Sequence, residues 1–507
     1  MAETFDVIVI GAGGSGLAAA YSASEHGGRV LVLEKRPQPG GTTGIAVGSF
    51  TAAGTSIQRQ AGIDDSPELH IEDAGKFPPP AIEARNADAM RAFFLQEAAN
   101  TFEWLRGLGL SFVGPSPEPP NRNPRMHNVV PGAKAYIAAL QLGLQRRGAV
   151  LLTNASAESL IKDGDRVVGV RAIVRGETHE YHASRGVILA AGDYASNHDL
   201  IAEHRGEQFR CIEGINPFAT GDGHKLAKDA GAWLVNMDVT YGPELRFVPS
   251  SQRPFQQCFP ASGAAARVMG AIAPRLPKWV MRSMIKRLLV TWQHPENSLF
   301  DDGAILVNRE GQCFVDETKY PDREIALSAQ PEKIAFILLD RRLVERYSAW
   351  PHFISTAPDI AYAYVADYLR LRPDIARSGD SLASVASQAG IDVAALENSV
   401  KSYNASLGQT SESKQPLESA PWVLLGPVKA YFTTTEGGAV VNQRMQVLGH
   451  NGNILRGLYA VGQNGLSGMI LWSHGLHIAW AMTSGRLAGI AVMSESARPE
   501  SVDLRAN

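Results

Sequence analysis

The chain has 507 residues, a formal net charge of −3, 45% hydrophobic residues and 20% charged residues. These values are typical of a globular protein of two or three domains, and they lack the basic excess that a nucleic-acid partner would favour. The three cysteines (Cys211, Cys258 and Cys313) lie far apart without a CxxC pair, so we expect no disulfide framework, iron–sulfur cluster or metal site. No apolar run reaches the ~18 residues of a membrane-spanning helix and the N-terminus has no signal-peptide pattern, so a cytoplasmic location is expected.

The N-terminal residues predict a strand–loop–helix–strand unit. Residues 5–10 are a short apolar run rich in β-branched side chains, which is typical of a buried parallel strand. A glycine-rich segment follows at 11–16, residues 17–25 predict an Ala-rich helix, and residues 29–33 predict a second strand. This order is that of a Rossmann nucleotide-binding unit.

The glycine-rich segment has the spacing of a dinucleotide-binding loop. Gly11, Gly13 and Gly16 fit G-x-G-x-x-G, in which the glycines allow a tight turn, a close approach to a pyrophosphate and close helix–strand packing. The phosphates then lie at the positive end of the helix dipole. Glu34 ends the second strand, at the ~20-residue distance expected for a carboxylate that binds a ribose diol. The sequence therefore predicts a bound dinucleotide.

The rest of the chain indicates an α/β fold with an insertion. We expect a Rossmann-type dinucleotide domain in two parts, 1–238 and 433–507. An inserted α+β cap domain is expected at 239–432, where prolines are scattered along the chain and the composition changes. Residues 408–419 are a polar stretch that predicts an exposed loop. Further helices are expected at 132–147, 340–372, 393–406 and 475–493, and further strands at 150–153, 167–174, 186–191 and 455–461.

Several motifs resemble those of the fumarate reductase/succinate dehydrogenase flavoprotein superfamily. The segment 35–43, KRPQPGGTT, is similar to that family's second phosphate- and flavin-contacting loop. Other similar segments follow in the family's order, namely VILAAGDY at 187–194, ATGDG at 219–223, GQCFVDE at 311–317, GLYAVG at 457–462 and GRLAG at 485–489. The resemblance covers most of the chain and implies FAD as the dinucleotide.

The resemblance also implies how FAD is held. No histidine lies between Gly40 and Thr51, where some relatives attach FAD covalently, so noncovalent binding is expected. The helix that opens at Gly475 is expected to direct free N–H groups at the flavin, where they stabilise the negative charge of its reduced form. The expected cofactor-binding residues are Gly11, Gly13, Gly14, Ser15, Gly16, Glu34, Lys35, Gly40, Gly41, Thr42, Thr43, Ala191, Gly192, Gly462, Gln463, Leu476 and Ile478.

The chain departs from true fumarate reductases where those enzymes bind a dicarboxylate. Thr434 stands in place of their histidine, and Tyr320-Pro321 stands in place of their arginine. Where they carry an Asn-Arg pair near the last helix, this chain has Leu471-Trp472-Ser473-His474. Loss of these cations should weaken binding of a small dianion. The pattern is more similar to the 3-ketosteroid dehydrogenases and related alicyclic-ketone dehydrogenases. It implies desaturation of a cyclic or steroid-like ketone at the α,β position, by hydride transfer to flavin N5.

Such a reaction needs a base for the α-proton and donors for the carbonyl oxygen. We expect Tyr320 to be the base or proton relay, and the N–H of Gly475 to polarise the ketone. Tyr241 is a candidate second donor, with a packed tyrosine as the alternative interpretation. His474 could donate to the carbonyl or could cap the helix. His127, in a polar stretch with two arginines, is expected to be a solvated residue rather than a catalyst.

The expected partners are a small-molecule ketone and an external electron acceptor. Residues 271–292 have the composition of a basic amphipathic helix, for which two interpretations stay open: peripheral contact with a membrane, or a cap helix that covers the active site. Two other functions also remain open. One is an ene-reductase of the fumarate or urocanate type that acts on an unsaturated acid or enone; the other is a flavin-binding or electron-transfer protein without turnover of its own.

Overall fold

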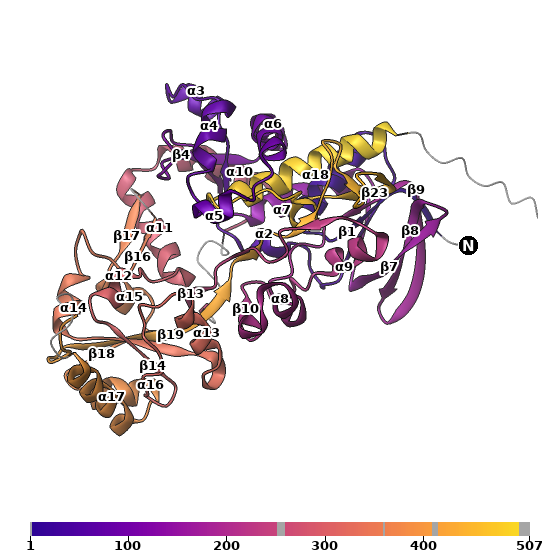
Figure 1. Ribbon diagram of the computed structural model, residues 1–507. Helices are drawn as coiled ribbons and strands as arrows, with labels where there is room; N and C mark the ends of the chain where they lie inside the picture. Colours follow the sequence, from indigo (N-terminus) through magenta and orange to yellow (C-terminus); the bar gives the residue numbers. More distant parts are fainter. Residues whose placement is uncertain (1–2, 251–258, 358–359, 408–413, 496–507) are drawn as a thin grey trace, which may run out of the picture.

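The computed structural model describes residues 3–250, 259–357, 360–407 and 414–495, which form two hydrophobic cores, each built around a β-sheet (Figure 1). The first sheet has the order β22–β23–β9–β1–β2–β6, with a hairpin β7–β8 paired to β9. Its members are β1 (Glu3–Ile10), β2 (Val30–Glu34), β6 (Val150–Thr153), β7 (Ala155–Asp163), β8 (Arg166–Val174), β9 (Glu177–Leu189), β22 (Gln446–Leu448) and β23 (Ile454–Ala460). Strands β6, β2, β1, β9 and β23 run parallel, so their carboxyl ends meet at one edge.

The N-terminal and C-terminal parts of the chain meet through helices α1 (Gly14–Glu25) and α18 (Leu476–Ser494), which pack against each other. Small residues allow the contact. A Cβ added at Gly485 would lie 2.4 Å from the carbonyl oxygen of Ser15, and one at Gly489 would lie 2.5 Å from Cβ of Ser22. Helix α7 (Lys134–Arg146) also packs on α1. The N-terminal Rossmann unit and the C-terminal helix therefore form one domain.

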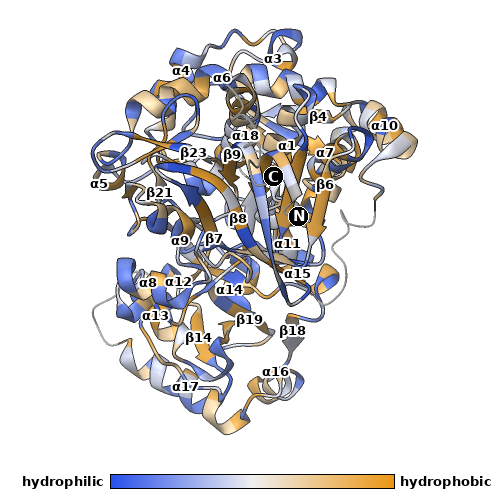
Figure 2. Cartoon of the chain, turned by 90° about the vertical axis from the view of Figure 1, so that its right-hand side faces the viewer, coloured by the Kyte–Doolittle hydropathy of each residue, from blue (hydrophilic) through white to orange (hydrophobic). Residues whose placement is uncertain are grey.

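The second sheet is built around the long strand β19 (Trp422–Phe432), and its interior is apolar (Figure 2). Its other strands are β10 (Glu213–Gly214), β13 (Glu244–Phe247), β14 (Ile305–Asn308), β15 (Ala335–Leu339) and β18 (Ala376–Gly379). Helices α13 (Asp322–Ser328), α14 (Arg341–Arg346), α15 (Val365–Leu371), α16 (Leu382–Ala389) and α17 (Val393–Ser406) belong to the same unit (Figure 1). Its core also includes residues from 194–212, ahead of the expected start of the cap at 239.

Two of the expected helices are wrong as single elements. The segment 340–372 holds α14 and α15 separated by a hairpin, β16 (Ser355–Ala357) and β17 (Ala361–Ala363), because Pro351 interrupts any helix between them. The segment 271–292 holds the end of α10 (Gly263–Ile272), a 3₁₀ turn and then α11 (Lys278–Trp292), since Pro274 and Pro277 break the run. The expected loop at 408–419 lies partly outside the described residues. The α/β fold with an inserted cap is confirmed.

Within the described ranges, no helix has both the length and the apolar character needed to cross a bilayer. The same residues contain no group of three or more His, Cys, Asp or Glu side chains placed to hold a metal ion.

Candidate functional site

A cavity of about 1490 Å³ lies at the carboxyl edge of the parallel sheet and extends toward the cap. Residues at or just beyond the carboxyl ends of four of the parallel strands line it: Gly11 after β1, Glu34 at the end of β2, Ala190 after β9 and Gly462 after β23. Open α/β sheets bind dinucleotides at this edge. The volume exceeds the roughly 300–1,000 Å³ of ordinary ligand pockets, which leaves room for a cofactor and a substrate.

The glycine loop has the shape that a pyrophosphate requires. Gly11 has φ +103°, and a Cβ at Gly16 would lie 1.9 Å from the carbonyl oxygen of Gly11, so both positions need glycine. A β-bridge pairs Gly13 with Gly40, which brings the first glycine loop against the second. Around Gly13 a Cβ would meet only the Cα of Gly41, at 3.8 Å. The open backbone between the two loops fits a diphosphate at the start of α1.

Glu34 is positioned to bind a ribose. It is buried, and its two carboxylate oxygens accept hydrogen bonds from the backbone N–H of Ala12 (2.8 Å) and of Arg36 (2.9 Å). A carboxylate has further lone pairs, so a diol in the cavity can still donate to it. Lys35 lines the cavity, but its ammonium is held by Asp222 (2.8 Å) and Thr220 (2.6 Å) of the ATGDG turn. That turn therefore anchors the loop.

The expected cofactor residues divide into two groups. Gly16, Gly40 and Leu476 do not line the cavity. Gly16 packs against the carbonyl of Gly11, Gly40 bridges to Gly13, and Leu476 is fully buried. The residues that line it are Gly11, Gly13, Gly14, Ser15, Glu34, Lys35, Gly41, Thr42, Thr43, Ala191, Gly192, Gly462, Gln463 and Ile478.

Sequence reasoning missed Asn464, which fixes the loop after β9. Its side chain accepts a hydrogen bond from the N–H of Ala191 (2.7 Å) and donates one to the carbonyl of Gly192 (2.9 Å). The residue follows the GLYAVG motif, whose 3₁₀ turn (Gly462–Gly465) had no sequence signal for this contact.

The N-terminus of α18 opens onto the cavity at Gly475. This residue has φ +88°, and a Cβ on it would lie 2.8 Å from Oγ1 of Thr51, which in turn donates to the carbonyl of His474 (2.6 Å). The first turn of a helix leaves N–H groups without intrahelical acceptors and carries a partial positive charge. His477 and Ile478, also in this turn, line the cavity, and His477 pairs with the buried Glu436 (2.9 Å).

Next to Gly475 lies a histidine–carboxylate pair that the sequence did not reveal. Buried Glu118 accepts hydrogen bonds from Nδ1 of His474 (2.6 Å), from the backbone N–H of His474 (2.7 Å) and from the hydroxyl of Ser473 (2.8 Å). The hydrogen bond to Glu118 raises the pKa of His474, although burial opposes it. The exposed part of this ring, 61% of the side chain, faces the cavity that it lines.

A second charged pair lies on the cap side. Arg246 of β13 binds Glu244 (2.6 Å), and both line the cavity together with His294. Burial raises the pKa of Glu244, but Arg246 and His294 outweigh burial and hold it below its usual range. Burial lowers the pKa of His294, which Glu244 only partly offsets. In this part of the wall Arg246 and the imidazole of His474 therefore each have a carboxylate partner.

The two predicted tyrosines have different settings. Tyr241 lines the cavity, pairs in register with Thr434 through β12 (Thr240–Tyr241) and β20 (Thr434–Thr435), and packs edge-on against Trp472 with ring centroids 5.3 Å apart. Burial raises its pKa. Tyr320 is 58% exposed and is not among the residues that line the cavity. The structure thus brings Tyr241, His474 and Gly475 together but leaves Tyr320 outside.

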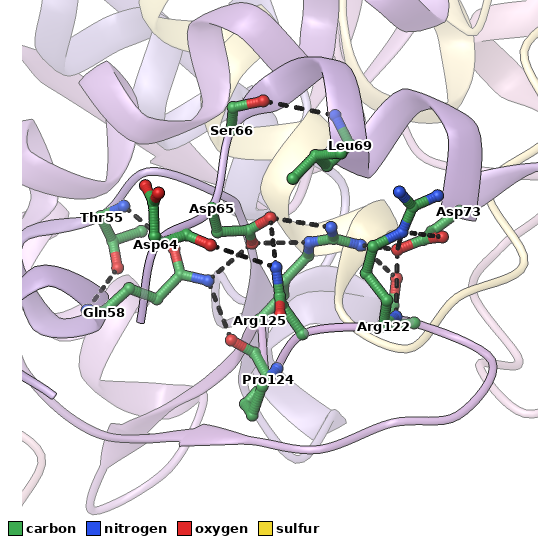
Figure 3. Close-up of polar contacts among 12 residues, drawn as sticks. Thr55, Gln58, Asp64, Asp65, Ser66, Leu69, Asp73, Arg122, Pro124 and Arg125 are labelled. Atoms are coloured by element: carbon green, nitrogen blue, oxygen red, sulfur yellow. Dashed lines mark hydrogen bonds and ion pairs between the residues drawn. The ribbon is translucent and has the colours of Figure 1, made fainter. Parts of the chain in front are cut away.

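The loop that carries Glu118 is anchored by a buried ion network (Figure 3). Fully buried Arg125 binds Asp65 (2.8 Å) and Asp73 (2.7 Å), and it also donates to the side chain of Asn121 (2.9 Å). The N–H of Asn121 donates to the carbonyl of Glu118 (2.9 Å). The expectation of a solvated polar loop is wrong here, because the chain folds back against the helices at 56–74.

His127 was expected to be solvated, and this expectation is also wrong. It is fully buried, contacts Oγ1 of Thr55 through Nε2 (3.0 Å) and packs on Phe102 at 4.6 Å between ring centroids. Burial lowers its pKa to about 4, so it is a neutral core residue.

Comparison with known proteins agrees with this geometry. A family model described as FAD binding domain matches residues 6–257 and 261–474. Fumarate reductase (cytochrome) from Shewanella frigidimarina is 27% identical over 504 residues, which cover 96% of this chain and 76% of that protein. Vinyl phenol reductase from Lactiplantibacillus plantarum is 24% identical, with 96% of both chains covered. NADH:fumarate oxidoreductase from Klebsiella pneumoniae is 26% identical over 91% of this chain, but the chain spans only 44% of its length.

Two solved structures share the fold. An open conformation of a flavocytochrome c3 fumarate reductase superposes with a TM-score of 0.71 at 24% identity, covering 97% of this chain and 78% of the other. A 3-ketosteroid Δ1-dehydrogenase from Sterolibacterium denitrificans gives a TM-score of 0.63 at 20% identity, covering 97% and 99%. The resemblance to the steroid enzymes is thus one of fold. With the dinucleotide cradle and the family match in agreement, the chain belongs to the FAD binding domain family and is an FAD-dependent oxidoreductase.

Proposed function

We propose that the protein interconverts an uncharged, largely apolar ketone and its α,β-unsaturated form. The observation that carries the proposal is the charge balance of the polar wall. Arg246 is paired with Glu244 and His474 with Glu118, so a carboxylate already compensates the positive charge that each could offer a dicarboxylate. Binding a dianion there would require breaking such pairs, which costs several kcal/mol. The part of the cavity wall formed by α11 is apolar, with Met284, Ile285 and Leu288 among its lining residues.

His474 is proposed to hold the carbonyl oxygen. Its Nδ1 is taken by Glu118, which leaves Nε2 as the ring nitrogen available to a substrate. Glu118 raises the pKa of His474 and so favours the protonated ring, whose Nε2–H can stabilise the negative charge that develops on an enolate oxygen. The N–H groups at the start of α18, beside Gly475, add to the same field. FAD, when bound, supplies the hydride donor or acceptor for the β-carbon.

Tyr241 is proposed to move the proton at the α-carbon. Burial raises its pKa, so the phenol carries its proton and has one to give. In the reductive direction a hydride reaches the β-carbon, a proton from Tyr241 reaches the α-carbon, and an enone becomes a ketone. Desaturation of the ketone is the reverse reaction on the same residues. Two electrons per turnover pass to or from an external redox partner.

The proposal is tested by anaerobic stopped-flow measurement of the flavin. Protein reduced with dithionite is mixed with cyclohexenone, a steroid enone, fumarate or urocanate, and the return of the oxidised flavin spectrum is followed. We expect the enones to reoxidise the flavin and the acids to leave it reduced. Fast reoxidation by fumarate or urocanate, with none by enones, would instead establish reduction of unsaturated acids.

That second function has one observation in its favour, the presence of Arg246 in the cavity wall. If Arg246 binds a substrate carboxylate, Glu244→Gln should free it and lower the KM for an unsaturated acid. Under our proposal the same substitution gives no turnover of acids.

A further inference from the structure

A long stretch of the cap carries basic charge alone. Residues 245–295 contain eight Lys and Arg residues and no Asp or Glu, in a chain whose net charge is −3, so the remaining residues carry −11. Clusters of four to eight basic residues on amphipathic helices favour anionic lipid surfaces. The eight are Arg246, Arg253, Arg267, Arg275, Lys278, Arg282, Lys286 and Arg287; of these, Arg253 lies outside the described residues.

Not all of this charge faces outward. Arg246 lies in the cavity wall, and Lys286 is held by Asp367 (2.9 Å). Arg267, Arg275 and Arg282 are exposed on α10, on the 3₁₀ turn and on α11. These three form the outer basic set.

Exposed apolar side chains alternate with the outer basic set. Val268 is 56% exposed, Ile272 51% and Trp279 74%, and no other large apolar side chain in the described ranges is more exposed than Trp279. Ile272 also lines the cavity, so the apolar side chains that face outward only are Val268 on α10 and Trp279 on α11. Trp and aliphatic residues beside Arg are the composition of helices that lie in the bilayer interface.

Other side chains of α10 and α11 face the cavity or the rest of the cap. Met269, Leu276, Met284 and Leu288 line the cavity, and α11 packs on the β16–β17 hairpin. A helix that only covers a site needs one apolar stripe and a polar outer face. α10 and α11 present apolar residues both to the cavity and to the outside, which the role of a cover does not explain.

We propose that α10 and α11 bind the surface of an anionic lipid bilayer, with Trp279 and Val268 inserted among the acyl chains and the outer basic set against the lipid phosphates. The cavity wall formed by the inner faces of these helices would then receive its substrate from the bilayer. This second statement rests on the proposed function and specifies its substrate as a lipophilic ketone. The binding itself does not depend on it.

The experiment is co-sedimentation of the FAD-loaded full chain with phosphatidylcholine vesicles, with and without one third phosphatidylglycerol. We expect binding to the anionic vesicles only, and weakening with salt, because ions screen exposed charges. The double variant Arg275→Glu/Arg282→Glu should bind at least about tenfold more weakly, at roughly 1 kcal/mol per basic residue. Trp279→Ser should also weaken binding about tenfold.

Matched controls distinguish binding through this surface from nonspecific binding to the vesicles. Trp350 is 64% exposed on the cap and Arg456 has a 61% exposed side chain on the other unit. Trp350→Ser and Arg456→Glu should bind like the parent protein. None of the test residues lines the cavity, so turnover of a water-soluble enone should be unchanged in every variant.

Equal binding to both vesicle types, or binding that neither test variant weakens, overturns the proposal. So does saturable binding of this surface to an acidic protein in the absence of vesicle binding. If the protein binds vesicles as expected but no ketone or enone reacts with the flavin, the proposed function is wrong and the proposal of membrane binding by α10 and α11 is retained.

Discussion

His474 owes its setting to Glu118, a carboxylate 356 residues away in the sequence. Three charged groups act on its ring from the surrounding elements: Glu118 and Glu244 favour the protonated form, and Arg246 opposes it. His294 faces the same group of residues but is itself held neutral by burial. The protonation of the imidazole is therefore controlled mainly by one neighbour, Glu118.

Glu118→Gln tests this control. Removing the carboxylate should lower the pKa of His474, so the ring loses its proton at lower pH and the high-pH limb of the activity profile moves to lower pH. The measurement is the pH dependence of kcat/KM for an enone. We expect kcat/KM at neutral pH to fall by about 10²-fold, in the range of a lost charge-stabilising group. An unchanged pH limb would show that Glu118 serves only to hold the loop.

The two tyrosines give a second test at the residue scale. Tyr241→Phe should lower the rate of flavin reoxidation by an enone about 10²–10⁴-fold, the usual contribution of a general acid. Tyr320→Phe should leave that rate within about twofold, because its side chain lies outside the cavity wall. Stopped-flow traces of both variants measure this rate of flavin reoxidation. The reverse ranking would restore Tyr320 as the proton-transfer residue.

At the scale of elements, the loop between β4 (Ser111–Ser116) and β5 (Met126–Val130) depends on buried charge (Figure 3). Arg125 compensates Asp65 and Asp73, and all three side chains are fully buried. Arg125→Met would leave carboxylates buried with fewer partners, which costs about 3–5 kcal/mol of unfolding free energy. It should also release Asn121 and loosen the backbone at Glu118.

Urea titration and kcat/KM measure the two effects of Arg125→Met together. Arg59→Met on the neighbouring helix α3 (Ser56–Gln60) is the control, since Arg59 is exposed and bonds only to a backbone carbonyl. It should shift stability by less than about 0.5 kcal/mol. Equal stability of the two variants would contradict a structural role for the network.

For the whole molecule, FAD is expected to hold the two chain ends together. The cradle combines the loop after β1 with Gly462 and the start of α18, so cofactor binding bridges distant parts of the sequence. Removing FAD should lower the Tm, since a ligand at about 100 times its Kd adds ~2.7 kcal/mol of stability. Differential scanning calorimetry of apo and reconstituted protein measures this. Because binding is expected to be noncovalent, acid precipitation should release free FAD; flavin that stays with the pellet would contradict it.

The sequence by itself determined the dinucleotide domain. Its signals are local: a strand, a glycine loop, a helix and Glu34 lie within about thirty residues, and glycine is required where φ is positive or a Cβ would collide. The FAD motifs further along the chain were found for the same reason. The elements of the cap were predicted less well, because proline breaks in 271–292 and 340–372 outweighed their helical composition.

Only the tertiary structure decided the polar wall of the cavity. Glu118, Glu244, Arg246 and His294 carry no motif, and each is an ordinary polar residue until folding places it beside His474. Their protonation states follow from burial and from neighbours that are remote in the chain. Tyr320 is a further example, since it stands where true fumarate reductases carry an arginine and yet its side chain does not line the cavity. Local pattern fixes where a cofactor binds, whereas the chemistry at the cofactor depends on contacts between distant segments.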